Sequence, residues 1–252
     1  MSESGTNAVV DLRDRTVIVT GASSGIGAAT ARALYAAGAN PVLAARRLDR
    51  IEELGAELGG ALSVRTDVTD EADVVHLVTA TVERHGRVDG LVNNAGASLH
   101  GASVEELDLD AFRQAVELNV FGVVRCMQAV LPAMRARGFG RIVNISSGTT
   151  GMVLPTVGAY TATKSALNTL SVIAREELAG TGIDVGLVLP STTATEFGGG
   201  RYQAGEETVP GLVAHSSAYV ADVILRALRT GEERIDIPHG PERPEVTAVP
   251  AG

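Results

Sequence analysis

The chain has 252 residues, of which 45% are hydrophobic, and a formal net charge of −9 at pH 7. This length suits one large α/β domain or two small ones. The acidic excess argues against a nucleic-acid partner, because phosphate-binding surfaces are usually rich in Lys and Arg. No apolar run approaches the ~20 residues needed to cross a bilayer. The polar residues 1–14 also lack the apolar core of a signal peptide.

The number of cysteines indicates the cellular compartment of the protein. The single cysteine, Cys126, has no second cysteine with which to form an internal disulfide, and it lies in an apolar helical stretch. We expect it to be a small buried hydrophobe. We therefore expect a cytoplasmic protein that has no membrane partner.

Short β-branched runs alternate with longer helical patterns along most of the chain. We expect strands at residues 16–20, 41–45, 61–66, 88–93, 141–146, 183–189 and 234–237. We expect helices at residues 25–37, 48–58, 71–85, 109–137, 158–179 and 217–229. Several strands are apolar on both faces, which is typical of a parallel sheet covered by helices on both sides. The pattern predicts an α/β fold: a Rossmann-type, doubly wound, seven-stranded parallel sheet in a single domain.

Three segments fall outside this alternation. Residues 1–14 are expected to be a flexible N-terminal tail, so that the domain spans residues 15–240. Residues 241–252 form a Pro-rich C-terminal tail, either disordered or draped on the surface. Residues 191–215, rich in Gly and Thr, predict a lid or a mobile substrate loop.

A glycine-rich turn connects the first predicted strand to the first predicted helix. Glycine permits unusual φ values and lets a phosphate approach backbone N–H groups, while the helix N-terminus adds partial positive charge. A glycine turn needed only for packing is the alternative. In this strand-to-helix context we predict a dinucleotide diphosphate site, formed by Gly21, Ser23, Ser24, Gly25, Ile26 and Gly27.

Tyr160 and Lys164 are four residues apart in a predicted helix. This spacing places both side chains on one helical face, about 5–6 Å apart at Cβ. A phenol has an ordinary pKa of ~10, and a neighbouring ammonium is expected to lower the pKa of Tyr160 toward the working range of an acid/base catalyst. A surface Lys that covers apolar area is the alternative for Lys164. Ser146 and Ser147 end the fifth strand, at the edge of the sheet where open α/β folds bind ligands.

These segments together resemble the short-chain dehydrogenase/reductase family, in its single-domain branch, over about residues 15–195. The similarity rests on the glycine spacing after Thr20, on Asn93-Asn94-Ala95-Gly96 after the fourth strand, and on four residues in family order. Those four are Asn119, Ser147, Tyr160 and Lys164. The resemblance implies an NAD(P)(H)-dependent oxidoreductase that interconverts a carbonyl and an alcohol by direct hydride transfer.

The resemblance also implies a role for each matched residue. Tyr160 exchanges the proton with substrate, and Ser147, thirteen residues before it, hydrogen-bonds the substrate oxygen, which leaves Ser146 as a capping residue. Asn119 holds a relay water for Lys164, which also binds the nicotinamide ribose. From the residues alone, an Asn inside an apolar helical run predicts a backbone distortion or a buried hydrogen bond. The remaining implied cofactor contacts are Asp67, Val68, Asn94, Ala95, Gly96, Pro190 and Thr195.

The chain departs from the family pattern in two places. Ser191 stands where the family usually has Gly, which predicts a restricted loop beside the nicotinamide amide. The Pro-rich tail replaces the glycine-rich end of many tetrameric members. A homo-oligomer, either dimer or tetramer, is still expected, because helices 109–137 and 158–179 carry apolar residues beyond one stripe. These are Val123, Val124, Met127, Val130, Leu167, Leu170 and Ile173.

The end of the second strand predicts the cofactor preference. NAD-specific Rossmann sites place an acidic residue there to bind the ribose 2′-hydroxyl, whereas this chain has Ala45 followed by Arg46 and Arg47. Two arginines just before a helix oppose its dipole, and a 2′-phosphate would remove that conflict. We expect NADP(H) to be preferred and NAD(H) to be possible. A solvated pair satisfied by Asp49, Glu52 or Glu53 is the alternative.

The substrate is expected to be a small, mostly apolar carbonyl or alcohol. Residues 97–100, 148–154 and 191–202 are expected to line its site, with apolar Met152, Val153, Leu154 and Phe197 among them. His100 either orients a polar group or is simply solvated. No metal is expected, because no Cys/His cluster is present.

Three other functions occur on related folds. A catalytically silent nucleotide sensor or scaffold would have lost Ser147, Tyr160 or Lys164, and all three are present. A sugar-nucleotide epimerase or dehydratase usually has a longer chain with a separate substrate domain. A Rossmann-type methyltransferase has no use for the Tyr–Lys pair.

Overall fold

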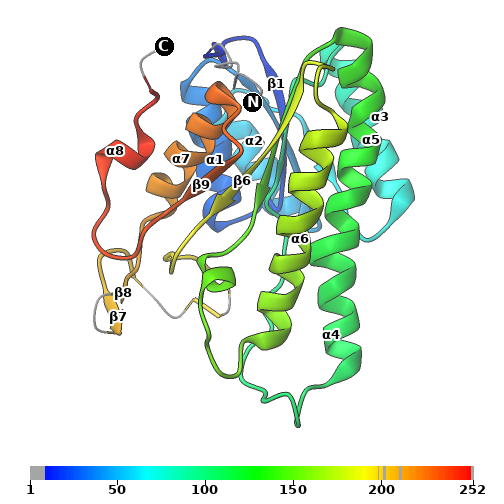
Figure 1. Cartoon of the computed structure of the whole chain (residues 1–252). Helices are drawn as coiled ribbons and strands as arrows, with labels where there is room; N and C mark the ends of the chain where they lie inside the picture. Colours follow the sequence, from blue (N-terminus) through cyan, green and yellow to red (C-terminus); the bar gives the residue numbers. More distant parts are fainter. Residues whose placement is uncertain (1–8, 198, 201–202, 210–211, 251–252) are drawn as a thin grey trace.

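The computed structural model describes residues 9–197, 199–200, 203–209 and 212–250 (Figure 1). Seven parallel strands form one sheet with helices on both faces, which confirms the predicted single-domain, doubly wound fold. The strands are β1 (Thr16–Thr20), β2 (Asn40–Ala45), β3 (Ser63–Arg65), β4 (Gly90–Asn93), β5 (Gly140–Ile145), β6 (Ile183–Leu189) and β9 (Arg234–Asp236). The main helices are α1 (Gly25–Ala36), α2 (Leu48–Glu57), α3 (Glu71–His85), α4 (Leu109–Val116), α5 (Gly122–Arg137), α6 (Gly158–Glu177) and α7 (Ser217–Thr230).

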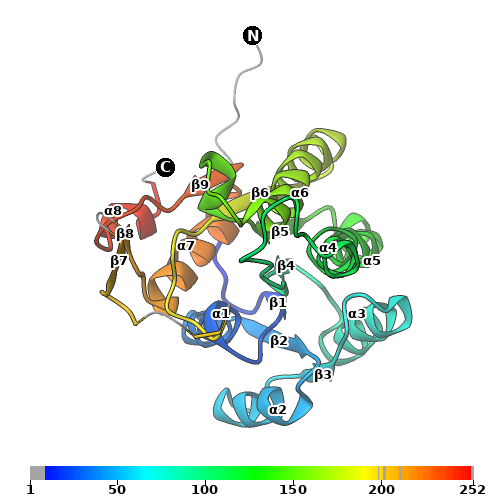
Figure 2. The same ribbon diagram turned by 90° about the horizontal axis from the view of Figure 1, so that it is seen from below.

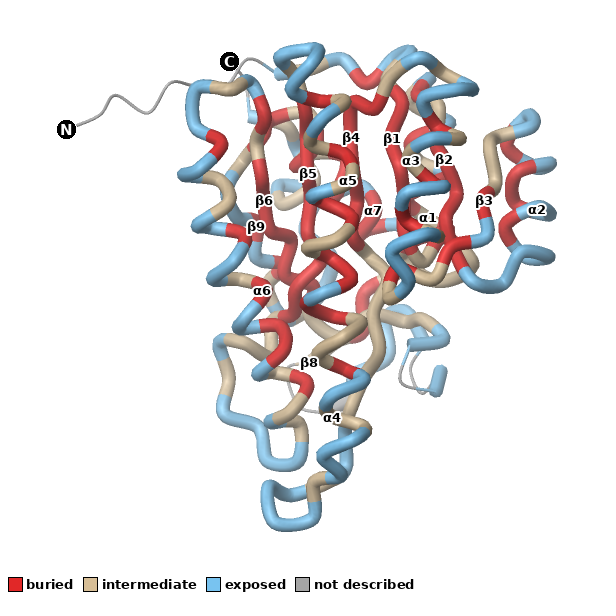
Figure 3. Tube along the Cα trace, turned by 90° about the vertical axis from the view of Figure 1, so that its right-hand side faces the viewer, coloured by how far each residue is buried: buried red, intermediate tan, exposed pale blue. Residues whose placement is uncertain are grey.

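The sheet has the strand order β3-β2-β1-β4-β5-β6-β9. Alternate side chains of the central strands enter two separate hydrophobic layers. Val17 and Val19 of β1 pack with α1, α2 and α7, whereas Ile18 packs on the opposite face with α3, α5 and α6 (Figure 2). The central strands are therefore buried throughout their length (Figure 3). The strand order reverses between β1 and β4, and ligands of open α/β sheets bind at the carboxyl ends beside such a reversal.

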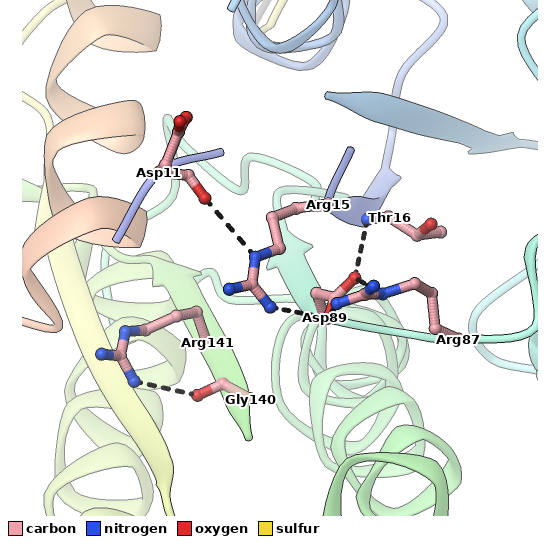
Figure 4. Close-up of polar contacts among 7 residues, drawn as sticks. All are labelled: Asp11, Arg15, Thr16, Arg87, Asp89, Gly140 and Arg141. Carbon is pink, nitrogen blue, oxygen red and sulfur yellow. Dashed lines mark hydrogen bonds and ion pairs between the residues drawn. The ribbon is translucent and has the colours of Figure 1, made fainter. Parts of the chain in front are cut away.

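A charged cluster at the opposite, amino edge of the sheet connects β1, β4 and β5 (Figure 4). The Asp89 carboxylate is 2% exposed; it accepts hydrogen bonds from the Thr16 N–H at 2.9 Å and from Arg87 Nη2 at 2.6 Å. Arg15 and Arg141 both lie against the Phe139 ring, at 4.5 and 5.1 Å from its centroid. A buried charge needs such partners. The cluster fixes the strand ends far from the carboxyl edge.

The helix predicted over residues 109–137 is continuous but irregular. A π-helical turn, η1 (Glu117–Phe121), separates α4 from α5. The whole run is long enough to span a membrane, and its most apolar 18-residue window has a mean hydropathy of 1.2, although 44% of that window is buried inside the domain. Core helices of ordinary domains pass the same test.

The segment predicted as a loop, residues 191–215, contains regular structure. Strands β7 (Glu207–Val209) and β8 (Leu212–Val213) form a short antiparallel pair, and Thr193 forms an isolated bridge with His215. Strands of three and two residues are too short for sequence periodicity to reveal. A 3₁₀ turn, η2 (Gly148–Gly151), follows β5.

Segments near both ends of the described part of the chain contact α7. Residues 1–8 are outside the described residues, but the Val10 N–H donates to the Arg229 carbonyl at 2.8 Å and Leu12 is 3% exposed. The flexible tail expected for residues 1–14 therefore differs from the structure from residue 10 onward, because Leu12 is part of the core. In the Pro-rich tail, the short helix α8 (Pro244–Thr247) is draped on α7, where Arg226 Nη1 donates to the Val246 carbonyl at 3.1 Å.

Candidate active site

The glycine turn between β1 and α1 has no room for a side chain at Gly21 or Gly27. A Cβ on Gly27 would lie 2.3 Å from the Gly21 carbonyl oxygen, and Gly21 has φ of +66°. The Asn94 amide donates to the carbonyls of Thr20 at 2.9 Å and Gly21 at 3.3 Å, which ties the segment after β4 to the turn. A cradle with this shape fits the diphosphate of a dinucleotide, which needs close approach to backbone N–H groups.

Asn119 lies inside η1 and is fully buried. Its Oδ1 accepts from the Ala97 N–H at 2.9 Å, while its Nδ2 donates to the Ala97 carbonyl at 2.9 Å and to Thr163 Oγ1 at 3.1 Å. The sequence predicted either a backbone distortion or a buried hydrogen bond, and the structure shows both. The side chain of Asn119 therefore connects the segment after β4 to α6.

Tyr160, Ser147 and Lys164 meet at the carboxyl end of β5. Tyr160 and Lys164 lie on α6 and are 7% and 5% exposed, and Ser147, the second residue after β5, caps η2. Lys164 Nζ donates to the Ile145 carbonyl at 2.8 Å. Ser147 Oγ accepts hydrogen bonds from the Thr149 N–H at 3.2 Å and from Thr149 Oγ1 at 3.0 Å, and the Ser147 side chain favours ionisation of the Tyr160 phenol. The predicted catalytic groups are thus brought together.

Burial controls the ionisation of both α6 residues. It raises the pKa of Tyr160 to about 12, and the hydrogen bond with Ser147 offsets this only in part. It lowers the pKa of Lys164 from 10.5 to about 8. The expectation that Lys164 lowers the pKa of Tyr160 is wrong for this structure, because desolvation of the phenolate is the larger effect and the ammonium is directed at a carbonyl.

Ser146, the neighbour of Ser147, has a purely structural set of partners. Its Oγ donates to Asn168 Oδ1 at 2.5 Å, and its N–H donates to the Val188 carbonyl at 2.8 Å. It therefore joins β5 to α6 and β6, whereas the hydroxyl of Ser147 faces Tyr160.

Aromatic and apolar side chains surround the Tyr160 ring. The His100 ring lies edge-on at 5.4 Å between centroids, and Phe197 lies at 6.0 Å. His100 is exposed, and its ring lies beside the Tyr160 ring. Val153 and Leu154 are exposed at the same edge of the sheet.

Arg47 contacts the glycine turn. Its Nε donates to Ser23 Oγ at 3.2 Å, and its Nη2 donates to Ser24 Oγ at 2.8 Å. The carboxylate that it contacts is Glu196, at 3.1 Å, which also contacts Arg50 at 2.8 Å. The sequence pointed to Asp49, Glu52 and Glu53 instead. It missed Glu196 because that residue is 149 positions from Arg47 and approaches only through the fold.

Asp67 and Val68 differ in what their side chains do. Burial tends to raise the pKa of Asp67, but hydrogen bonds from Thr69 and the positive charges of Arg46 and Arg65 outweigh it and lower that pKa. The Asp67 carboxylate is therefore ionised at neutral pH. The side chain of Val68 is buried against α5, so only its backbone is available to an adenine ring.

The segment after β6 completes the site. The Pro190 carbonyl accepts from the Gly148 N–H at 2.8 Å. The Thr195 side chain lies over the glycine turn, only 3.0 Å from where a Cβ on Gly25 would be. Contacts thus join the loops after β1, β2, β4, β5 and β6 at the carboxyl edge of the sheet. Within the described part of the chain, no group of three or more His, Cys, Asp or Glu side chains is placed to hold a metal ion.

Comparison with known proteins shows the family. The model of the short chain dehydrogenase family matches residues 15–204. The chain is 33% identical over 223 residues to an uncharacterized oxidoreductase of Staphylococcus haemolyticus, a match that covers 85% of this chain and 96% of that protein. This chain is also 39% identical over 190 residues to the glycine betaine reductase ATRR of Emericella nidulans. That match covers 74% of this chain but only 15% of the reductase.

Solved structures agree in fold. The 3-ketoacyl-(acyl-carrier-protein) reductase of Brucella melitensis, complexed with NADH, has a TM-score of 0.83 at 27% identity, covering 90% of this chain and 97% of that one. The alcohol dehydrogenase of Thermococcus sibiricus, complexed with 5-hydroxy-NADP, has a TM-score of 0.80 at 28% identity, covering 91% and 98%. The chain belongs to the short-chain dehydrogenase/reductase family. It is an oxidoreductase of alcohol and carbonyl groups that uses a nicotinamide cofactor.

Proposed function

We propose that this enzyme prefers NADP(H) and that Tyr160 exchanges the proton with a small, mostly apolar carbonyl or alcohol substrate. The observation that carries the proposal is the buried group formed by Tyr160, Ser147 and Lys164 beside the glycine turn. When bound, the nicotinamide ring donates or accepts the hydride. The chain itself supplies binding, orientation and proton transfer.

In this mechanism Ser147 donates a hydrogen bond to the substrate oxygen and stabilises the charge that develops there. Tyr160 donates its proton to that oxygen during reduction and accepts it during oxidation. The raised pKa of Tyr160 keeps the phenol protonated at neutral pH, which suits a proton donor. Lys164 would bind the nicotinamide ribose, and the second lone pair of Asn119 Oδ1 is available to a relay water.

The substrate preference follows from the side chains around Tyr160. Phe197 and Leu154 are 46% and 39% exposed at the mouth, and the Phe197 ring lies beside the Tyr160 ring. An apolar substrate that covers them gains by their burial. A panel of ketones and aldehydes of increasing apolar area tests this, and a preference for charged or sugar-like carbonyls would contradict it.

Arg46, Arg47, Ser23 and Ser24 support the NADP(H) preference. Arg47 already bonds both serine hydroxyls at the glycine turn, so cationic and hydroxyl donors are gathered where a 2′-phosphate would extend from the adenosine ribose. The exposed ion pair of Arg47 with Glu196 contributes little, because solvent screens it. A phosphate accepting charge-assisted hydrogen bonds would displace it.

We expect Arg46→Ala/Arg47→Ala to lower kcat/KM for NADPH by ~10- to 100-fold, since hydrogen bonds to charged groups contribute ~1.5–3 kcal/mol. The value for NADH should change only a few-fold. Arg32→Ala is the matched control, because it removes an exposed arginine of α1 that pairs with Glu57 and does not contact the turn. A wild type that uses NADH as well as NADPH, or an unchanged ratio in the double variant, would refute the preference.

We also propose a homo-oligomer, a dimer or tetramer, formed through α5 and α6. Four of the apolar residues expected at a subunit contact, Val123, Met127, Val130 and Leu167, are instead buried in the core of the domain. Leu170 and Ile173 are 39% and 51% exposed, and Phe121 is 51% exposed. We expect light scattering at micromolar concentration to report a dimer or tetramer; a monomer would refute the proposal.

A further inference from the structure

His215 is a fully buried histidine that connects three parts of the chain. Its Nδ1 lies 2.9 Å from Ser191 Oγ, directly after β6, and its Nε2 lies 2.8 Å from the Gly240 carbonyl oxygen. Its ring packs on Tyr219 of α7, with 5.1 Å between centroids. None of these contacts takes part in the mechanism above.

The chemistry of the partners assigns the protons. A carbonyl only accepts, so Nε2 of His215 carries the hydrogen and donates it to Gly240. In the neutral ring Nδ1 is then an acceptor, and the Ser191 hydroxyl must donate to it. The two hydrogen bonds therefore have one direction: Ser191 donates to His215, and His215 donates to Gly240.

The backbone of His215 holds the same loop from the other side. Its N–H donates to the Thr192 carbonyl, and its carbonyl accepts from the Ala194 N–H, both at 2.9 Å. Ser217 Oγ adds a bond to the Ala194 carbonyl at 3.0 Å. Residues 191–194 are therefore fixed along their whole length, and Thr195 follows them directly over the glycine turn.

The segment that follows Gly240 is also held in place. The Ser216 N–H donates to Glu242 Oε1 at 2.6 Å, and the Tyr219 hydroxyl both donates to and accepts from the backbone of Arg243 at 3.0 Å. The Gly240 carbonyl is thus a fixed acceptor for His215.

We propose that His215 is a positioning residue for cofactor binding, which acts through the Ser191 hydroxyl to hold residues 191–195 in the conformation that meets the dinucleotide. The proposal rests on the nicotinamide cofactor of the family and not on the NADP(H) preference. It gives Ser191 a function at the position where the family usually has Gly. A loop ordered in advance binds more tightly, because the cost of ordering it is not subtracted from the binding free energy.

Four variants distinguish the effects of the two hydrogen bonds that the His215 ring makes with Ser191 and Gly240. Ser191→Ala deletes the donor, and His215→Gln retains a donor for Gly240 but removes the acceptor for Ser191. His215→Asn retains an acceptor at the Nδ1 position. The double variant Ser191→Ala/His215→Gln completes a cycle that measures the coupling of the two side chains. Thr81→Val is the matched control, since it removes a buried hydroxyl that donates to the Leu77 carbonyl within α3.

The measurement is the cofactor dissociation constant from nicotinamide fluorescence, which no Trp in the chain complicates. The titration uses whichever of NADPH and NADH the wild type binds more tightly, so failure of the proposed preference does not affect it. We expect Ser191→Ala, His215→Gln and the double variant to weaken binding by the same factor, about 10-fold, as expected when one ordering contact is lost. His215→Asn and Thr81→Val should bind as the wild type does, and kcat at saturating cofactor should change little in every variant.

A merely structural role gives a different result. The melting temperature would then fall in Ser191→Ala and His215→Gln while the dissociation constant stayed the same, and this would overturn the proposal. Additive losses in the double variant would also overturn it, because they would show that the two side chains act independently. Failure of His215→Asn to restore binding would exclude the bond to Ser191 as the cause.

Discussion

Tyr160→Phe is expected to lower kcat by ~10²–10⁴-fold, the usual contribution of a general acid or base. The substitution removes only the hydroxyl of a side chain that is 7% exposed, so the packing of its ring against His100 and Phe197 is retained. Cofactor affinity and melting temperature should remain close to those of the wild type. Steady-state reduction of an aldehyde or ketone, followed by the loss of absorbance of the reduced cofactor, measures the effect.

Tyr35→Phe is the control for this substitution. Tyr35 lies on α1, is 46% exposed and is remote from the crevice, so it should retain full activity. If Tyr160→Phe retained more than about a tenth of wild-type kcat, the assignment of the proton donor would be wrong.

Lys164→Met is expected to abolish turnover and, at neutral pH, to stabilise the cofactor-free fold. Burial lowers the pKa of Lys164 from 10.5 to about 8, which corresponds to about 3 kcal/mol of unfavourable charge burial at 1.36 kcal/mol per pH unit. The hydrogen bond from Nζ to the Ile145 carbonyl offsets ~1 kcal/mol of this unfavourable free energy. The variant should therefore gain ~2 kcal/mol in free energy of unfolding at pH 7.

The pH dependence of the free energy of unfolding shows whether burial of the Lys164 charge is unfavourable. Between pH 8 and 10.5 the unfolded state binds more protons at this Lys than the folded state does, so the stability of the wild type rises with pH in that window. Below pH 8 the Lys is charged in both states and the penalty is constant. The advantage of Lys164→Met should shrink by ~2 kcal/mol between pH 7 and 9.5 in urea unfolding. A constant difference would show that the ammonium is not desolvated.

The elements that the sequence predicted well are those with repetitive patterns. The strands β1 and β5, which are apolar on both faces, and the long helices lie within a few residues of the expected bounds. The site was also foreseeable, because the glycine turn and the Tyr160–Lys164 pair have fixed spacings along the chain. Asn119 even indicated the irregular turn that contains it.

The features that were missed depend on contacts between distant residues. Nothing near Ser191 in the chain reveals its bond to His215, and nothing near Arg47 reveals Glu196. The pKa of Tyr160 was predicted in the wrong direction because spacing shows the neighbouring Lys but does not show how deeply the phenol is buried. Leu12 was read as part of a tail for the same reason, since its core contacts come from the rest of the fold.

The π-helical turn around Asn119 makes the length of this segment as important as its composition. Each residue advances a helix by about 100°, because an α-helix has 3.6 residues per turn. A π-helical turn holds one residue more than a regular turn does. Deleting a single residue from Glu117–Phe121 would therefore allow an uninterrupted α-helix with better backbone hydrogen bonds and nearly the same orientation of α4 and α5, but the widened turn that places Asn119 would be lost. Asn119 would then leave Ala97 and Thr163. A shortened chain of this kind could fold well and still be inactive, an outcome that substitution scans, which keep the chain length fixed, cannot reveal.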